Sequence, residues 1–160
     1  MKIIKNEDPI ITEAVRANDG YCPCATEKTS DTKCMCKDFR DKIKSGYIGE
    51  CHCGLYKTEP YIVYICGDSR YGDDFLYWNT IYSTRGYLVL LPSNLNKWWT
   101  PSDNDVIAFD TVHHQKLYAA EEIFVIDKYG KVSEDLARDI ERMKRLGKVI
   151  KYASDMRGLT

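Results

Sequence analysis

Six of the seven cysteines lie between residues 20 and 56, and all six occur as Cys-x-Cys pairs. This window holds few aliphatic residues, so a module of about 60 residues built around it needs a metal site or another cross-link to stabilise its small core. The feature therefore restricts the first part of the chain to a fold organised by its thiols. The pairs are Cys22/Cys24, Cys34/Cys36 and Cys51/Cys53.

Three kinds of chemistry use thiols grouped in this way. A structural zinc ion takes four tetrahedral nitrogen or sulfur ligands, and an iron–sulfur cluster takes four thiolates. Disulfides would use all six cysteines, but thiols stay reduced in the cytoplasm. Six thiols are two more than one four-ligand site needs, and four ligands with one redox-active pair account for the total.

We expect a cytoplasmic location for two reasons. The first residues, MKIIKNEDPIITEA, contain no apolar segment of the kind found in signal peptides. No apolar run approaches the roughly 18 residues of a membrane helix. A membrane is therefore not an expected partner.

Length and composition limit the architecture further. The chain has 160 residues, 44% of them apolar, and a formal net charge of −1. That length suits a small module joined to a compact domain, and the near-zero charge gives little attraction to nucleic acid. The composition changes near Pro60, from a part rich in cysteine, lysine and aspartate to one with regular apolar segments. We predict two parts, 1–59 and 60–160.

The second part alternates strand-like and helix-like segments, and this order predicts crossover connections and a parallel four-stranded sheet with flanking helices. Ligands of such sheets bind at the carboxyl ends of the strands. In the first part we expect only two short helices, at 9–17 and 37–44. In the second we expect strands at 61–66, 87–92, 122–127 and 148–153, and helices at 71–85, at 105–118 and between a Ser133 cap and Gly147.

The cysteine window resembles the catalytic chain of ferredoxin:thioredoxin reductase. The resemblance rests on the ordered motifs CPC, CMC and CHC and covers about a quarter to a third of the chain. It implies a 4Fe-4S cluster held by four cysteines, next to a redox-active pair formed by Cys24 and Cys53. It also implies that Cys24 attacks the target disulfide and that His52 handles protons. The implied cluster ligands are Cys22, Cys34, Cys36 and Cys51.

The second part resembles the nucleoside 2-deoxyribosyltransferase-like domains, a small Rossmann-like group. The matching stretches include YICGDSRYGDDFLYWNTIYSTRGYLVLLP and EDLARDIERMKRLGKVIKY. The resemblance implies a nucleoside or nucleotide bound at the strand ends. It also implies that Asp139 occupies the position of the attacking carboxylate and that Asp127 contacts substrate. The loop and helix positions that we assign to this ligand are Gly67, Asp68, Ser69, Arg70 and Glu134.

Other residues have simpler expected roles. We expect His113 and His114 to be surface or packing residues of their helix, and Cys66 to be an inert buried thiol. Trp98 and Trp99 could cover a pocket or cap the core.

We predict an α/β protein with a small, cysteine-rich helical Fe–S module followed by a compact Rossmann-like domain. Its predicted activity is the reduction of a protein disulfide with cluster electrons, using a ferredoxin-like donor and a thioredoxin-like target. Two alternatives stay open. One is a nucleoside or nucleotide glycosyl-bond enzyme whose cysteine module is structural, with zinc in place of the cluster. The other is a redox or nucleotide sensor without catalytic activity.

Overall fold

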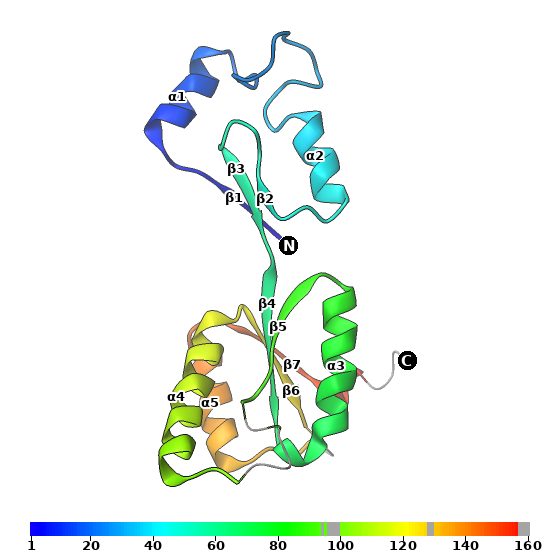
Figure 1. Cartoon of the computed structure of the whole chain (residues 1–160), viewed down its shortest axis with the longest axis vertical. Coiled ribbons are helices and arrows are strands. Elements are labelled where there is room, and N and C mark those ends of the chain that lie inside the picture. The colour runs from blue at the N-terminus through cyan, green and yellow to red at the C-terminus, as the bar shows by residue number, and fades with distance from the viewer. Residues whose placement is uncertain (94, 96–99, 128–129, 157–160) are drawn as a thin grey trace. The chain divides into compact units, whose positions relative to one another are not determined.

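The computed structural model describes residues 1–93, 95, 100–127 and 130–156 (Figure 1). The predicted tryptophan pair, Trp98 and Trp99, lies outside these residues. The chain forms two compact units, Met1–Pro60 and Tyr61–Thr160. Among the described residues, no helix combines the length and the apolar content needed to cross a bilayer.

The first unit contains the two expected helices and, in addition, a small antiparallel sheet with the strand order β1-β3-β2. The two helices were predicted for this cysteine-rich module, whereas the small sheet was not. Lys2 pairs with Glu59 across the β1–β3 ladder. The pairing of these two strands therefore joins the beginning and the end of the first unit. The elements are β1 (Lys2–Lys5), α1 (Pro9–Ala17), α2 (Lys37–Lys44), β2 (Gly49–Glu50) and β3 (Tyr56–Glu59).

Local sequence explains where the helices of the first unit begin. Asp8 caps α1 by accepting a hydrogen bond from the backbone N–H of Ile10 at 2.8 Å, and Pro9 occupies the first helical turn. Helix α2 buries Phe39, which is 1% exposed. Phe39 packs with Val15 and Leu55 in the core of this unit.

The second unit contains the expected parallel sheet, with the strand order β5-β4-β6-β7 and flanking helices. The mixed α/β class is confirmed, and the four strands and three long helices lie within a few residues of their predicted bounds. A short 3-10 turn and a short final helix were not predicted. The elements are β4 (Tyr61–Gly67), η1 (Ser69–Tyr71), α3 (Gly72–Thr84), β5 (Tyr87–Leu90), α4 (Asp103–Ala119), β6 (Glu122–Ile126), α5 (Glu134–Arg145), β7 (Val149–Tyr152) and α6 (Ala153–Met156).

Helices cover both faces of this sheet (Figure 1). On one face, α4 and α5 pack on the strands through Leu117, Ile140 and Met143. On the other face, α3 packs through Phe75 and Trp78. Strand β6 is buried along its whole length, as expected of a central parallel strand. The carboxyl end of β4, at Gly67, lies near the first turns of α4 and α5, at Val106 and Leu136.

Side-chain caps set where α4 and α5 begin, near the carboxyl end of β4. Ser102 and Asp105 form a reciprocal capping box at the start of α4. Ser133 accepts a hydrogen bond from the N–H of Leu136 at 3.3 Å at the start of α5. Gly147, with φ of +75°, follows the C-cap of α5, as its position in the sequence predicts.

Candidate functional sites

The six cysteines of the first unit are free thiols in contrasting environments. Cys22 and Cys51 are buried, and Cys24 is exposed. The remaining three, Cys34, Cys36 and Cys53, are half-buried and pack against the apolar core of the unit. The fold therefore gathers four thiols that are up to 19 positions apart in the sequence, Cys34 to Cys53, around one core.

Cys51 contacts a second cysteine and the first residue of strand β3. Its sulfur lies 3.6 Å from the sulfur of Cys53, and it accepts a hydrogen bond from the backbone N–H of Tyr56 at 3.1 Å. The backbone N–H of Cys51 donates to the carbonyl of Tyr56 at 2.8 Å. Strand β3 thus holds Cys51 in place through hydrogen bonds to both its sulfur and its main chain.

A hollow of about 500 Å³ opens beside the exposed thiol. Cys22, Cys24, Cys36 and His52 line it together. His52 is exposed, so its imidazole is available to solvent next to these thiols. The structure therefore brings together at this hollow three predicted site cysteines and the predicted proton-handling histidine.

Burial and the neighbouring thiols influence how easily these cysteines ionise. Burial is the larger cause and raises the pKa of Cys24 and of Cys34, and the charges of nearby thiolates raise it further. The pKa of Cys53 rises to about 12, again mainly through burial.

The cysteines of the first unit are of the ligand type that both a zinc ion and a 4Fe-4S cluster take. Among the described residues, no three His, Cys, Asp or Glu side chains converge closely enough to enclose one metal ion. A four-iron cluster spreads its four thiolate ligands further apart than a single ion does, and thiolates are the ligands that it uses. The cysteines of the first unit fit a 4Fe-4S cluster in ligand type and in number.

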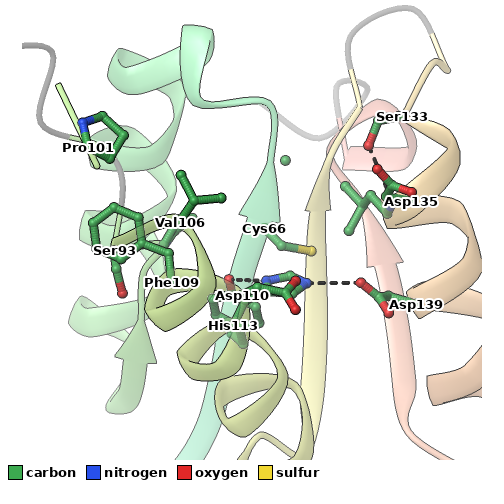
Figure 2. A pocket seen from close by; sticks show the side chains of 14 residues that line it. Cys66, Ser93, Pro101, Val106, Phe109, Asp110, His113, Ser133, Asp135 and Asp139 are labelled. Carbon is green, nitrogen blue, oxygen red and sulfur yellow. Dashed lines mark hydrogen bonds and ion pairs between the residues drawn. The ribbon is translucent and has the colours of Figure 1, made fainter. Parts of the chain in front are cut away.

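The second unit contains a separate cavity of about 350 Å³ at the carboxyl ends of its strands (Figure 2). Its walls come from the end of β4, the segment after β5 and one side each of α4 and α5. Phe109 and Leu136 supply apolar surface. The titratable side chains among the described lining residues are Tyr64, Cys66, Asp110, His113, Asp135 and Asp139.

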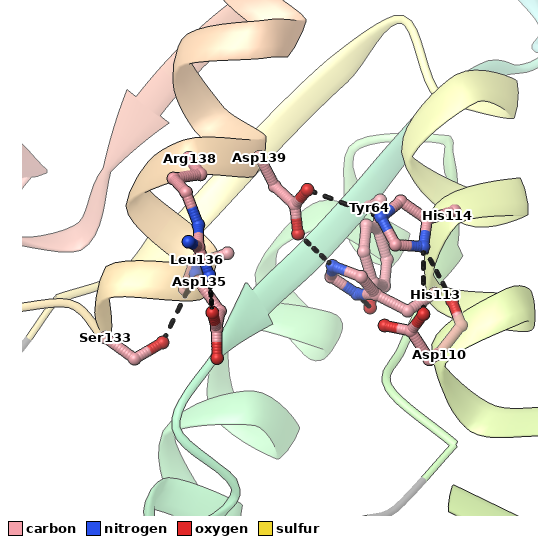
Figure 3. A network of polar contacts seen from close by, with 9 residues as sticks. All are labelled: Tyr64, Asp110, His113, His114, Ser133, Asp135, Leu136, Arg138 and Asp139. Carbon is pink, nitrogen blue, oxygen red and sulfur yellow. Dashed lines mark hydrogen bonds and ion pairs between the residues drawn. The ribbon is translucent and has the colours of Figure 1, made fainter. Parts of the chain in front are cut away.

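A chain of polar contacts crosses the cavity wall between α4 and α5 (Figure 3). The Tyr64 hydroxyl lies 2.7 Å from His113 Nδ1, and His113 Nε2 lies 3.1 Å from Asp139 Oδ2. The other oxygen of Asp139 lies 3.4 Å from His114 Nε2. The carboxylate of Asp139 is thus placed between two imidazoles.

Two described cations lie next to lining residues of this cavity, and each is bonded to one of them: Lys116 Nζ donates to Ser93 Oγ at 2.8 Å, and Arg138 pairs with Asp135. Among the described lining residues, none is Lys or Arg, whereas Asp110, Asp135 and Asp139 bring three carboxylates. Arg70 binds its neighbour Asp68 with its guanidinium, at 2.6 Å, instead of lining the cavity. The described lining therefore carries more acidic than basic side chains.

The structure separates the residues predicted for nucleoside binding into two groups. Gly67 and Asp139 line the cavity. Asp127 is buried, and both of its carboxylate oxygens accept hydrogen bonds from Ser154, one from the backbone N–H at 2.9 Å and one from the hydroxyl at 2.5 Å. Asp127 therefore tethers the start of α6 in this structure. Glu134 is exposed in the first turn of α5.

Sequence reasoning did not find the roles of Tyr64 and His113. Tyr64 lies within a strand that reads as uniformly apolar, and His113 was expected to be a surface or packing residue. The only available signal was the helical spacing of Val106, Phe109 and His113, all of which line the cavity. That spacing predicted a shared helix face but not what the face would contact.

The chain was compared with protein-family models, with curated proteins and with solved structures. No match was found in any of them. Function is therefore argued from the two sites themselves.

Proposed function

We propose that the first unit is an iron–sulfur disulfide reductase module that reduces a thioredoxin-like protein disulfide with electrons from a ferredoxin-like donor. The observation that supports this most is that four of the paired cysteines pack at one core, while exposed Cys24 lines a hollow together with Cys22, Cys36 and His52. Buried and exposed thiols in one group suit a division between ligands and a reacting pair.

The ligands that we propose for a 4Fe-4S cluster are Cys22, Cys34, Cys36 and Cys51. Each is buried or half-buried, as thiols that hold a cluster and do not react with a partner should be. When bound, the cluster would supply electrons one at a time, and the reduction of one disulfide takes two of them.

The reacting thiols are Cys24 and Cys53 in this proposal. The Cys24 thiolate attacks one sulfur of the target disulfide, a mixed disulfide forms, and the other target sulfur leaves as a thiolate. Cys53 then attacks the Cys24 sulfur, which releases the second target thiolate and leaves a Cys24–Cys53 disulfide. Two electrons from the donor restore both thiols. His52 donates protons to the departing thiolates, which an exposed imidazole can do near neutral pH.

Anaerobic purification followed by iron and acid-labile sulfide analysis tests this proposal. The expected result is about four iron and four sulfide per chain, with broad visible absorbance. Cys24→Ser should abolish disulfide reduction and keep the iron, whereas Cys36→Ser should lose the iron. Cys66→Ser in the second unit is the matched control and should keep both. Zinc without sulfide would contradict the reductase and favour a structural metal module.

A second candidate function belongs to the second unit. We infer that its cavity binds a nucleoside and that the unit cleaves or transfers an N-glycosidic bond. The specific support is that Asp139, at the position of the attacking carboxylate in the resemblance, lines the cavity together with His113 and Tyr64. Chromatography of 2′-deoxynucleosides incubated with the protein tests it. Asp139→Ala should abolish any release of base and leave disulfide reduction unchanged.

A further inference from the structure

The sulfur atoms of Cys51 and Cys53 are in contact. They lie 3.6 Å apart, and the chain turns between them, because the N–H of Gly54 donates to the carbonyl of Cys51 at 2.9 Å. Two cysteines can be joined without a movement of the backbone only where their side chains already approach each other. Cys51 and Cys53 meet that condition.

Two consecutive residues hold these sulfur atoms through their backbone. The N–H of Tyr56 donates to Cys51 Sγ at 3.1 Å, and the backbone of Leu55 forms a hydrogen bond with the Cys53 thiol. Leu55 is buried and packs with Phe39 in the core of the first unit. The core therefore sets the position of both sulfur atoms.

The two thiols differ in their access to solvent. Cys51 is 7% exposed, whereas Cys53 is half-buried. A small molecule in solution can therefore reach Cys53 more easily than Cys51. Cys24, the partner of Cys53 in the proposed reductase, lines the hollow, whereas Cys53 packs at the core beside Cys51.

We propose that Cys51 and Cys53 form a disulfide in the cluster-free chain, by exchange with a small-molecule disulfide such as oxidised glutathione, and that this disulfide and the cluster exclude each other. The disulfide follows from the sulfur contact alone. The mutual exclusion rests on the proposed function, because it requires that Cys51 is a cluster ligand. The cluster then decides the partner of Cys53, which is Cys24 in the loaded chain and Cys51 in the cluster-free chain.

The exchange balances in two steps. The Cys53 thiolate attacks one sulfur of oxidised glutathione, a bond forms between these two sulfurs, and one glutathione leaves as a thiolate. The Cys51 thiolate then attacks the Cys53 sulfur, which forms the Cys51–Cys53 bond and releases the second glutathione as a thiolate. The two protein thiols are oxidised, and one oxidised glutathione is reduced to two molecules of glutathione.

The sulfur contact accelerates the second step rather than the first. Burial raises the pKa of Cys53, so little of this thiol is ionised near neutral pH and the first attack is slow. Once the mixed disulfide has formed, Cys51 already lies beside the sulfur that it attacks. Groups held in position in this way react much faster than groups that meet by diffusion. The mixed disulfide therefore closes instead of accumulating.

Closure of this pair removes a proposed cluster ligand. A 4Fe-4S cluster takes four thiolates, and a sulfur in a disulfide is no longer a thiolate. The three proposed ligands that remain are Cys22, Cys34 and Cys36. Reduction of the disulfide restores the fourth, so the state of this pair couples cluster loading to the small thiols in the surroundings.

Peptide mapping identifies the disulfide, because trypsin separates the three cysteine pairs. Cleavage after Lys and Arg gives the peptides 17–28, 34–37 and 45–57, each with one Cys-x-Cys pair. The full chain is freed of metal with a chelator and incubated with oxidised glutathione without air, and the remaining thiols are alkylated. We expect peptide 45–57 to carry no alkyl group and to lack two hydrogen atoms. A disulfide that joins peptide 45–57 to peptide 17–28 in this metal-free chain would overturn the proposal.

Variants separate this pair from the exposed thiol. Cys24→Ser should form the same internal disulfide, and loss of that disulfide in the folded variant would contradict the pairing. Cys51→Ser should stop at the first step, so that glutathione on Cys53 rises at least about tenfold above its level in the wild type. Cys66→Ser, in the second unit, is the control and should give the wild-type map. Because Cys24 is exposed, its variant tests the pairing even where Cys51→Ser does not fold.

The same treatment of the chain purified with its iron tests the exclusion. The internal disulfide should fall to less than about a tenth of its level in the metal-free chain, because the cluster occupies Cys51. A chain that forms this disulfide and keeps its iron would overturn the exclusion. A chain that purifies without iron would overturn the proposed function, whereas the disulfide would still be decided by the map of the metal-free chain.

Discussion

The hydroxyl of Tyr82 donates a 2.6 Å hydrogen bond to Glu122 Oε1 in the interior of the second unit. Glu122 is 2% exposed, and its other oxygen accepts a 2.7 Å hydrogen bond from Lys151 Nζ. A buried carboxylate is tolerated only where its oxygens are paired in this way. The contact therefore joins α3, β6 and β7 through one side chain at the amino end of the sheet.

Tyr82→Phe should destabilise the protein because it leaves Glu122 Oε1 buried without this donor. The expected loss in the free energy of unfolding is about 1–3 kcal/mol. Urea denaturation measures it. Tyr77→Phe, at a half-exposed position on the same helix, is the matched control and should cost less than about 0.5 kcal/mol. Equal stabilities of the two variants would contradict this role for Glu122.

Gly67→Ala should disturb the end of β4 where it borders the cavity. An added Cβ would lie 2.9 Å from both the Cβ and the backbone oxygen of Ile126, so β4 and β6 would have to separate. Forced overpacking of this kind costs about 1–3 kcal/mol. Thermal unfolding measures the loss, and amide NMR shifts should change mainly near β4 and β6. An unchanged spectrum around Ile126 would show that the strands accommodate the methyl group.

Much of the second unit was predictable because the sequence patterns that mark its helices and strands are local. The caps of α5, Ser133 and Gly147, lie directly at the ends of its apolar repeat. The antiparallel sheet of the first unit was missed for the opposite reason. Its β1–β3 ladder pairs Lys2 with Glu59, and a four-residue strand carries too little pattern to predict a partner so distant.

The two candidate sites also differ in how far the sequence alone could predict them. The cysteine motifs indicate chemistry by their spacing alone, so the sequence could name those residues. The contacts of His113 depend on tertiary structure, because Tyr64 and Asp139 are 49 and 26 positions away. Asp127 illustrates the opposite case, in which the position in the sequence leaves two roles open. Its place at a strand end is equally suitable for binding a ligand and for capping the following helix, and the structure has it bonded to Ser154.

Cys66 should make the second unit less stable in alkali. Burial, with a smaller contribution from the charge of Asp139, raises the pKa of this thiol to about 12. In the unfolded chain a thiol ionises near pH 8.5. The resulting stabilisation is fully present below about pH 8.5 and is lost as the pH rises toward the folded value.

The measurement is the free energy of unfolding of wild type and Cys66→Ala between pH 8 and pH 10. The wild type should lose about 1–2 kcal/mol more than the variant over this range. Other groups titrate in both proteins, so they cancel in the comparison. Parallel curves would contradict a raised pKa at Cys66.

The carboxylates of the cavity should make it discriminate against phosphate. A 5′-phosphate would enter a space lined by Asp110, Asp135 and Asp139, without Lys or Arg among the described lining residues. Like charges brought together at a partly desolvated site cost binding free energy. We therefore expect 2′-deoxyadenosine to bind at least about tenfold more tightly than its 5′-monophosphate, a difference of about 1.4 kcal/mol.

Isothermal titration of the full chain with both compounds measures this difference. Asp135→Asn should narrow it, because the substitution removes one carboxylate and releases Arg138 from its ion pair. Asp155→Asn, on α6 and away from the lining residues, is the control and should leave the ratio unchanged. Tighter binding of the monophosphate would mean that cations outside the described lining reach the ligand. The cavity would then have to be assigned to nucleotides, because three carboxylates alone cannot attract a phosphate.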